Sequence, residues 1–295
     1  MSNDRRRRAF SLLELLVVIS IVALLIGLLL SAVQRVRARS AALACQDHLR
    51  QIRVALHGYH STHQSLPPGI TAQSGSREPY LGWQARLLPH IEQGALWEAA
   101  QAAYRADSWF LSPPHELVRT EFLAVYSCPS DPRMAPQSGP DRGKPGLTSY
   151  VGVEGRDQFR RDGVLFADSH VRLTDVTDGT SCTLMVAERP PSADLVFGWW
   201  YAGWGQSKDG SAEMILGAAE QIEYATFTHC PSNTTPFRPG QLSNQCDALH
   251  YWSLHVGGAH FALCDGSVRL IRYEAAPIML ALATRGGGEA VSVPD

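Results

Sequence analysis

Three side chains near the C-terminus have types and spacing that could support acid–base chemistry or metal binding. His255 and His260 are followed by Asp265, and a histidine beside a carboxylate can act as a base with an orienting partner. The sequence around them contains no serine elbow, phosphate-binding loop or metalloprotease helix. We therefore favour a structural interpretation, in which Asp265 accepts backbone N–H bonds in a turn and His255 bonds a loop carbonyl.

Other polar side chains give weaker indications of chemistry. Asp175 and Asp178 offer oxygen atoms close together, which suits calcium, but the spacing lacks the order of an EF-hand loop. Calcium at these two residues is therefore a hypothesis, and we predict no other metal and no cofactor. Glu188 is a lone carboxylate, which is poor evidence for glycoside hydrolysis. Three histidines at helical spacing are expected to cap helix carbonyls or lie half exposed rather than bind a metal: His57, His60 and His63.

The sequence contains six cysteines, and outside the cytoplasm they could form disulfides. None belongs to a C-x-x-C pair, so a zinc ribbon is not expected. Cys230 and Cys246 bracket a loop rich in Pro and Asn, and a bridge there would restrict the unfolded chain by about 3 kcal/mol. We favour this pair. Cys182 and Cys264 lie in strand-like runs and could be simple buried thiols.

The N-terminus combines four arginines with a long apolar segment. The segment spans about 21 residues from Phe10 to Leu30, which at about 1.5 Å per residue can cross a hydrocarbon layer of about 30 Å. A carboxylate inside a bilayer is costly, so Glu14 is expected to need a partner. Two simpler interpretations are a plain anchor, in which the positive helix end offsets Glu14, and a twin-arginine export signal.

The residues Ala9-Phe10-Ser11-Leu12-Leu13-Glu14 resemble the leader of type IV prepilins and type II secretion pseudopilins. The resemblance implies that a prepilin peptidase cuts after Ala9 and methylates the new amino terminus on Phe10. Glu14 would then neutralise the N-terminal amine of a neighbouring subunit. That family usually has Gly where this chain has Ala9.

A second resemblance covers nearly the whole chain. His255 is followed, after nine residues, by Asp265-Gly266, which resembles the H-x(9)-DG motif of a large family of bacterial prepilin-like proteins with a central domain of unknown function. Other matching segments are AVQRVR, LHGYHSTHQSLPPG, LLPHIEQ, CPSDP and DGTSCTLMVAE. The chain departs from that family at Ser31, commonly Pro, and at Cys182, commonly Asn.

We predict an α+β fold of pilin type: a long N-terminal α-helix, transmembrane in its first half, packed on a mostly antiparallel β-sheet domain. Apolar residues continue at helical spacing to about Tyr59, and Pro67-Pro68-Gly69 ends any helix. The expected parts are a basic leader at 1–9, a transmembrane and amphipathic helix at 10–62, and an extracytoplasmic α+β domain at 63–295.

Short apolar runs at period two predict the strands of that domain, and Asp265-Gly266 predicts its clearest hairpin. A last short helix is expected over residues 277–284. The aromatic segment GWWYAGW, residues 198–204, would suit a sugar or a partner if exposed, although burial in the core is commoner. The strand-like runs are 149–153, 163–166, 171–173, 182–187, 195–201 and 222–227.

Composition and charge point to a protein without nucleic-acid partners, since the net charge is −2. The expected function is that of a structural, non-enzymatic prepilin or pseudopilin, single-pass in the inner membrane with its N-terminus cytoplasmic. Its partners would be prepilin peptidase and other pilin subunits, in a type II secretion or type IV pilus fibre. The alternative is a membrane-tethered module that binds a ligand or carbohydrate and uses the leader only for export.

Overall fold

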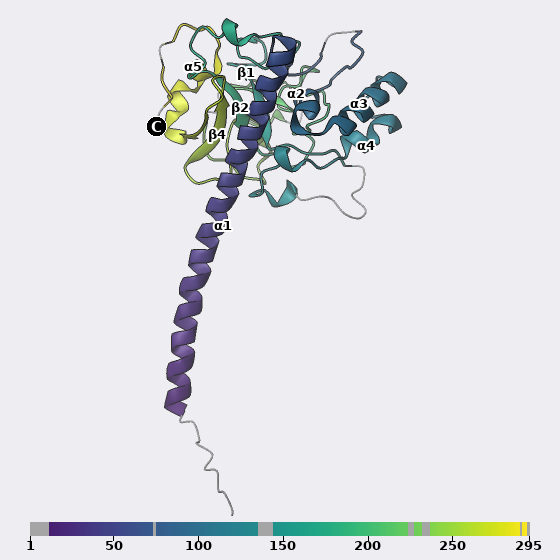
Figure 1. Cartoon of the computed structure of the whole chain (residues 1–295). Helices are drawn as coiled ribbons and strands as arrows, with labels where there is room; N and C mark the ends of the chain where they lie inside the picture. Colours follow the sequence, from purple (N-terminus) through teal and green to yellow (C-terminus); the bar gives the residue numbers. More distant parts are fainter. Residues whose placement is uncertain are drawn as a thin grey trace, which may run out of the picture.

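The computed structural model describes residues 12–72, 75–134, 144–223, 227–231, 237–289 and 291–293. Helix α1 (Leu12–His63) dominates its shape, with 52 residues in one continuous rod. Figure 1 shows that the C-terminal half of α1 lies against the domain, while the N-terminal half projects away from it. Side chains are exposed throughout 12–40, and buried ones begin at Cys45. The change from an all-round apolar rod to an amphipathic helix explains this division.

Five strands form one sheet, in the order β3-β1-β2-β4-β5. All neighbouring pairs are antiparallel except β1 and β3, which run parallel. This architecture confirms the predicted α+β class, with a long N-terminal helix and a mostly antiparallel sheet. The strands are β1 (Tyr150–Gly155), β2 (Leu184–Glu188), β3 (Ile215–Gly217), β4 (Gly258–Leu263) and β5 (Val268–Arg272).

Short helices fill the connections. The segment around Pro89 forms short helices, and the expected C-terminal helix is α5. The remaining α-helices are α2 (Trp83–Arg86), α3 (Gly94–Ala106), α4 (Glu116–Arg119) and α5 (Met279–Ala283). The 3₁₀ helices are η1 (Leu88–Ile91), η2 (Pro113–His115), η3 (Ala124–Tyr126), η4 (Pro132–Met134), η5 (Leu173–Asp175), η7 (Gln245–Leu249) and η8 (Tyr273–Ile278).

The sheet separates two hydrophobic clusters, because side chains alternate between its faces along each strand. On β4, Phe261 and Leu263 enter the cluster that also contains α5, whereas Ala262 enters the cluster that contains α1. His260, two residues before Ala262, therefore lies on the α1 face. A register shift in the β2–β4 pairing accompanies the run of Met185 and Val186, both of which pack into the α1 cluster.

The β4–β5 hairpin meets the spine helix at its tip. Asp265 accepts a hydrogen bond from Ser267 N at 2.7 Å, and Gly266 adopts φ +84°, as the predicted Asp-Gly turn requires. A Cβ at Gly266 would lie 2.9 Å from Arg53 Nη1 and 3.4 Å from His57 Nε2, both on α1. The turn thus needs glycine for its backbone and brings the hairpin onto the helix.

Several expected strands are not strands. Among the described residues, 163–166, 171–173 and 195–201 form turns, 3₁₀ helix or single bridges, and the parallel strand β3 was not expected. For example, Val164 and Leu165 both donate their N–H to Val153 O rather than to a continuous ladder. Short apolar runs indicate burial but do not distinguish a strand from a buried irregular segment.

Two adjacent glycines at the start of β4 allow a test of this geometry. A Cβ at Gly258 would overlap the backbone carbonyl of Ile271 on β5, whereas a Cβ at Gly257 meets nothing within 4 Å. We expect Gly258→Ala to lower the free energy of unfolding by about 3 kcal/mol, because the strand pair must separate. Gly257→Ala should cost about 1 kcal/mol, from its positive φ alone. Denaturant unfolding of both variants measures the difference, and equal losses would contradict the close strand contact.

Candidate functional site

A buried carboxylate at the end of β2 organises the most polar region of the α1 face. Glu188 is 2% exposed and accepts two hydrogen bonds at Oε2, from His260 N at 2.7 Å and from His260 Nδ1 at 3.1 Å. The β2–β4 pairing places the two residues side by side, since Ala187 is opposite Phe261. Because an ionised carboxylate only accepts, the His260 imidazole carries its proton at Nδ1.

His255 approaches the same carboxylate from the loop before β4. Its Nε2 lies 3.3 Å from Glu188 Oε1, and its side chain is 5% exposed. The loop is held by Ser253, whose hydroxyl donates to Gly258 O at 2.7 Å and accepts from His255 N at 3.0 Å. The two histidine rings contact edge to face, with centroids 5.2 Å apart.

The charge of Glu188 is set by these neighbours. Burial alone would raise its pKa, but the hydrogen bonds and charges of His255 and His260 outweigh burial and lower the pKa to about 2. The carboxylate is therefore ionised under all ordinary conditions. It serves as an acceptor and a negative charge, not as a proton donor.

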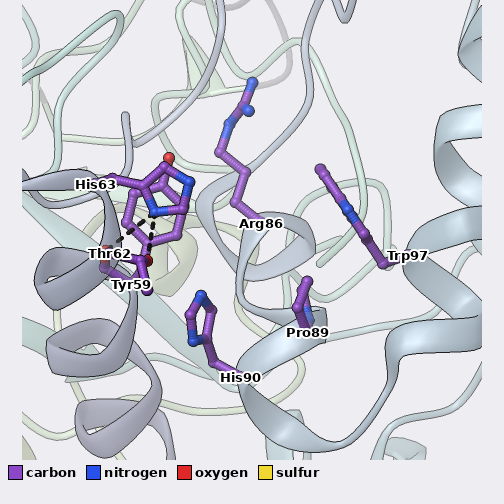
Figure 2. A pocket seen from close by; sticks show the side chains of 7 residues that line it. All are labelled: Tyr59, Thr62, His63, Arg86, Pro89, His90 and Trp97. Atoms are coloured by element: carbon purple, nitrogen blue, oxygen red, sulfur yellow. Dashed lines mark hydrogen bonds between the residues drawn. The ribbon is translucent and has the colours of Figure 1, made fainter.

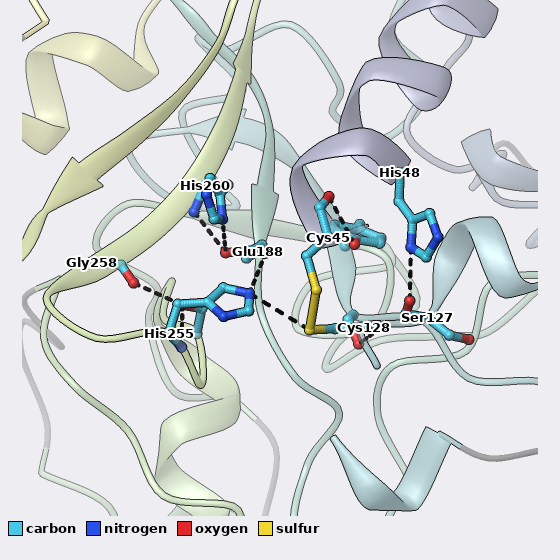
Figure 3. The surroundings of a disulfide bond; sticks show 11 residues. Cys45, His48, Ser127, Cys128, Glu188, His255, Gly258 and His260 are labelled. Atoms are coloured by element: carbon cyan, nitrogen blue, oxygen red, sulfur yellow. Dashed lines mark hydrogen bonds and ion pairs between the residues drawn. A yellow bond between two sulfur atoms is a disulfide. The ribbon is translucent and has the colours of Figure 1, made fainter. Parts of the chain in front are cut away.

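A disulfide lies beside this cluster and joins the spine helix to the domain. Cys45 of α1 is bonded to Cys128, which follows η3, and the Cα atoms are 5.4 Å apart. Figure 3 shows His255 between this disulfide and Glu188, with His255 Nε2 3.7 Å from Cys128 Sγ. Nearby, His48 Nδ1 on α1 donates to Ser127 O at 3.0 Å. Covalent and hydrogen-bonded links thus fix α1 at the same place.

Sequence reasoning missed this centre. It noted His255 and His260 but paired them with Asp265, which lies at the opposite end of β4, about 20 Å away by strand length. The bond from His255 to a loop carbonyl stays a prediction, and the contacts of His255 Nε2 with Glu188 and Cys128 were not expected. The six cysteines were the available signal for a bridge near the helix, but connectivity cannot be deduced from spacing.

A second buried acidic group lies at the other end of the sheet. Glu154 of β1 and Glu220 after β3 are both buried, and the Glu220 carboxylate accepts from the Ser211 hydroxyl, from Gln206 Nε2 at 3.0 Å and from Gly217 N at 2.7 Å. Burial raises the pKa of Glu220 to about 7 and, together with the neighbouring charge of Glu220, raises that of Glu154 well above its usual range. The pair is arranged to hold a proton.

Two pockets open on the surface along α1. One, of about 300 Å³, lies near the C-terminal end of the helix, where His63 stacks on Tyr59 with centroids 3.9 Å apart and faces His90 and Trp97 (Figure 2). The other, of about 290 Å³, has Cys128, His48 and Asp131 among its walls. The second pocket therefore lies next to the Cys45–Cys128 disulfide.

The two calcium candidates, Asp175 and Asp178, form hydrogen bonds with the backbone. Asp175 Oδ2 accepts from Arg172 N at 2.8 Å, and Asp178 accepts from Gly287 N at 2.6 Å and Gly288 N at 2.8 Å. Asp175 therefore binds a backbone N–H of its own 3₁₀ turn and Asp178 binds two near the C-terminus, and calcium at these residues stays a hypothesis.

The other cysteines and the aromatic segment occupy different places. The structure contains a disulfide between Cys230 and Cys246, the pair that the sequence favoured. Cys182 and Cys264 are free thiols, and Cys182 is only half buried. In the aromatic segment Trp200 is buried, while Trp204 is 37% exposed.

The residues predicted for processing and assembly lie at the N-terminus, where the described part of the chain begins at Leu12. Ala9 and Phe10 fall outside the described residues. Glu14 lies in the first turn of α1, within the exposed apolar part of the helix. This helix is long and apolar enough to cross a membrane once.

Comparison with known proteins identifies the family. Residues 34–277 match a family described as proteins of unknown function (DUF1559), and residues 4–30 match the prokaryotic N-terminal methylation motif. The chain belongs to the DUF1559 family. The two matches confirm the prepilin-like assignment and imply processing by a prepilin peptidase and association with a membrane. No curated protein and no solved structure matches the chain.

The Glu154–Glu220 pair predicts a pH dependence of stability. A carboxyl group whose pKa is raised in the fold keeps a proton that the unfolded chain releases, so its contribution to stability is complete below pH 4.5 and is lost as pH rises through 7. We expect Glu154→Gln to reduce this loss, because it removes one of the two carboxyl groups whose pKa values are raised by burial. Unfolding at several pH values measures it. Glu98→Gln, on an exposed position of α3, is the control that should keep the wild-type slope.

Proposed function

We propose that this DUF1559 protein is a membrane-anchored, prepilin-like structural subunit that assembles through its N-terminal helix into a fibre of secretion or pilus type. The observation that carries the proposal is the exposed apolar half of α1. Every residue from Leu12 to Leu30 is exposed, although most of this segment is aliphatic. The globular domain does not cover it, so lipid or other helices must.

The division of the chain supports the same function. In this proposal residues 1–9 form a leader removed by prepilin peptidase, 10–62 form the membrane and spine helix, and 63–295 form a domain outside the inner membrane. The first fully buried residue of α1 is Cys45, and there the disulfide and His48 fix the helix to the domain. The first half is then left for packing against the same segment of other subunits once a fibre leaves the membrane.

Glu14 supplies the register in this proposal. A carboxylate in an apolar helix contact is costly unless it is paired, and a methylated amine at Phe10 of a neighbouring subunit would provide the opposite charge. Glu14 lies four residues after Phe10 in the sequence. If Glu14 of one subunit pairs with the Phe10 amine of the next, the pair sets a fixed axial offset between the two subunits.

The mature N-terminus tests the first step. We expect mass spectrometry of the protein from its native membrane to find residues 1–9 removed and one methyl group on Phe10. Inhibition or deletion of the prepilin peptidase should preserve the full-length chain. A mature chain that keeps its arginines, or one that has lost the whole apolar segment, contradicts the proposal.

Replacement of Glu14 tests the assembly step. Glu14→Gln should leave membrane insertion and domain folding unchanged but reduce incorporation into fibres by at least about 10-fold, since one charge pair is lost per subunit contact. Ser20→Ala is the matched control, because Ser20 lies in the same exposed segment and bonds only its own helix, at Val17 O. Sedimentation of sheared fibres and immunoblotting measure incorporation. Equal incorporation of the two variants would overturn the role of Glu14.

A second candidate function has a specific observation in its favour. Trp204 and Trp109 are 37% and 46% exposed, and their ring centroids are 5.2 Å apart, with Tyr80 edge-on to Trp204. Exposed aromatic pairs of this kind suit stacking against a sugar or an apolar partner. A tethered binding module would keep this binding in the Glu14→Gln variant, whereas a fibre subunit would lose assembly.

A further inference from the structure

Four side chains from separate parts of the chain bring potential metal ligands together beside the spine helix. Cys45 comes from α1, Cys128 from the segment after η3, Glu188 from the end of β2 and His255 from the loop before β4. One ligand atom from each, two sulfurs, one imidazole nitrogen and one carboxylate oxygen, lie within 4.8 Å of one another. The side chains of Glu188 and His255 are 2% and 5% exposed.

One carboxylate oxygen of this group, Glu188 Oε1, is not held by His260. Glu188 Oε1 is buried, and its contact with the imidazole of His255 is long for a hydrogen bond. His255 Nε2 lies 3.3 Å from this oxygen and 3.7 Å from Cys128 Sγ. Once the disulfide is reduced, this oxygen, the imidazole nitrogen and the two sulfurs are close enough to share one cation.

We propose that the protein, when Cys45 and Cys128 are reduced, binds one zinc ion through Cys45 Sγ, Cys128 Sγ, His255 Nε2 and Glu188 Oε1. Two thiolates, one imidazole and one carboxylate form a tetrahedral set that zinc accepts, and the thiolates disfavour calcium and magnesium. The second carboxylate oxygen of Glu188 is held by His260, which fixes the orientation of the ligand.

The disulfide and the zinc site are then alternative states of the same two sulfurs. A dithiol reductant breaks the Cys45–Cys128 bond by giving two electrons and two protons, and is itself converted to a disulfide. Zinc binding then displaces the two thiol protons into solvent. A disulfide oxidant reverses the change: it takes two electrons from the thiolates and two protons from solvent, becomes a dithiol, and the Cys45–Cys128 bond re-forms with release of zinc. In either state α1 stays linked to the domain, by a covalent bond or through the metal.

A path to the site exists on the surface. The pocket of about 290 Å³ that includes Cys128 in its wall also contains His48 and Asp131. In the proposal, an ion or a small reductant approaches Cys128 from this side. The proposal is independent of fibre assembly, since its ligands all belong to one chain.

Cobalt substitution in the full chain, held in detergent micelles, tests the site. The background is Cys230→Ser with Cys246→Ser, because His229, Cys230 and Cys246 form another group of possible ligands. After reduction with a phosphine, we expect about one cobalt ion per chain, with visible bands of a tetrahedral ion and the near-ultraviolet bands of thiolate ligation. Zinc should displace it, and the oxidised chain should bind none.

Variants decide whether these four residues are the ligands. Cys45→Ser should abolish the thiolate bands, and Glu188→Gln should weaken cobalt binding at least about 10-fold. Cys264→Ser, which removes a buried free thiol outside the group, is the control and should bind as the background does. Absence of cobalt binding in the reduced background, or binding unchanged by Cys45→Ser, would overturn the proposal.

The zinc site can also be tested if reduction of the disulfide unfolds the protein. If the reduced background protein lacks a cooperative thermal transition, added zinc should restore it, whereas calcium should not. Failure of zinc to restore the transition, or equal recovery in the Cys45→Ser variant, would also count against the zinc site.

Discussion

Burial of one stripe of α1 against the sheet is the constraint on which the structure depends. Leu49, Ile52 and Leu56 are fully buried in the cluster that α1 shares with the sheet, and they occur at helical spacing. Their burial contributes about 1.5 to 3 kcal/mol each relative to exposure. Because the stripe begins only at Cys45, the first half of the same helix receives no cover from the domain.

Two environments therefore act on one helix. The N-terminal half suits lipid or neighbouring helices, since its side chains are apolar on every side, while the C-terminal half requires a folded domain on one side. The Cys45–Cys128 disulfide lies at the boundary, together with the bond from His48 to Ser127. This position fixes where the rod leaves the domain and makes the linkage resistant to sliding or rotation of the helix.

The polar centre beside that boundary follows from the sheet. A buried carboxylate is tolerated only when it is paired, and β2 and β4 satisfy this by placing Glu188 beside His260. His255 completes the group from a loop whose shape depends on Gly258 and Ser253. The H-x(9)-DG motif thus has two separate roles: its histidine reaches Glu188, and its Asp-Gly turn meets α1 at Arg53 and His57.

The sequence by itself determined the long apolar N-terminal helix, the prepilin-like family, the α+β class and the Asp265-Gly266 hairpin. Each depends on local periodicity or on residue types a few positions apart, and such patterns can be recognised in the sequence itself. The tertiary structure alone decided the partners of Glu188, the parallel strand β3 and the Cys45–Cys128 bond, whose residues are 83 positions apart. Such contacts depend on which strands become neighbours and on how α1 lies across them, and no local pattern encodes that arrangement.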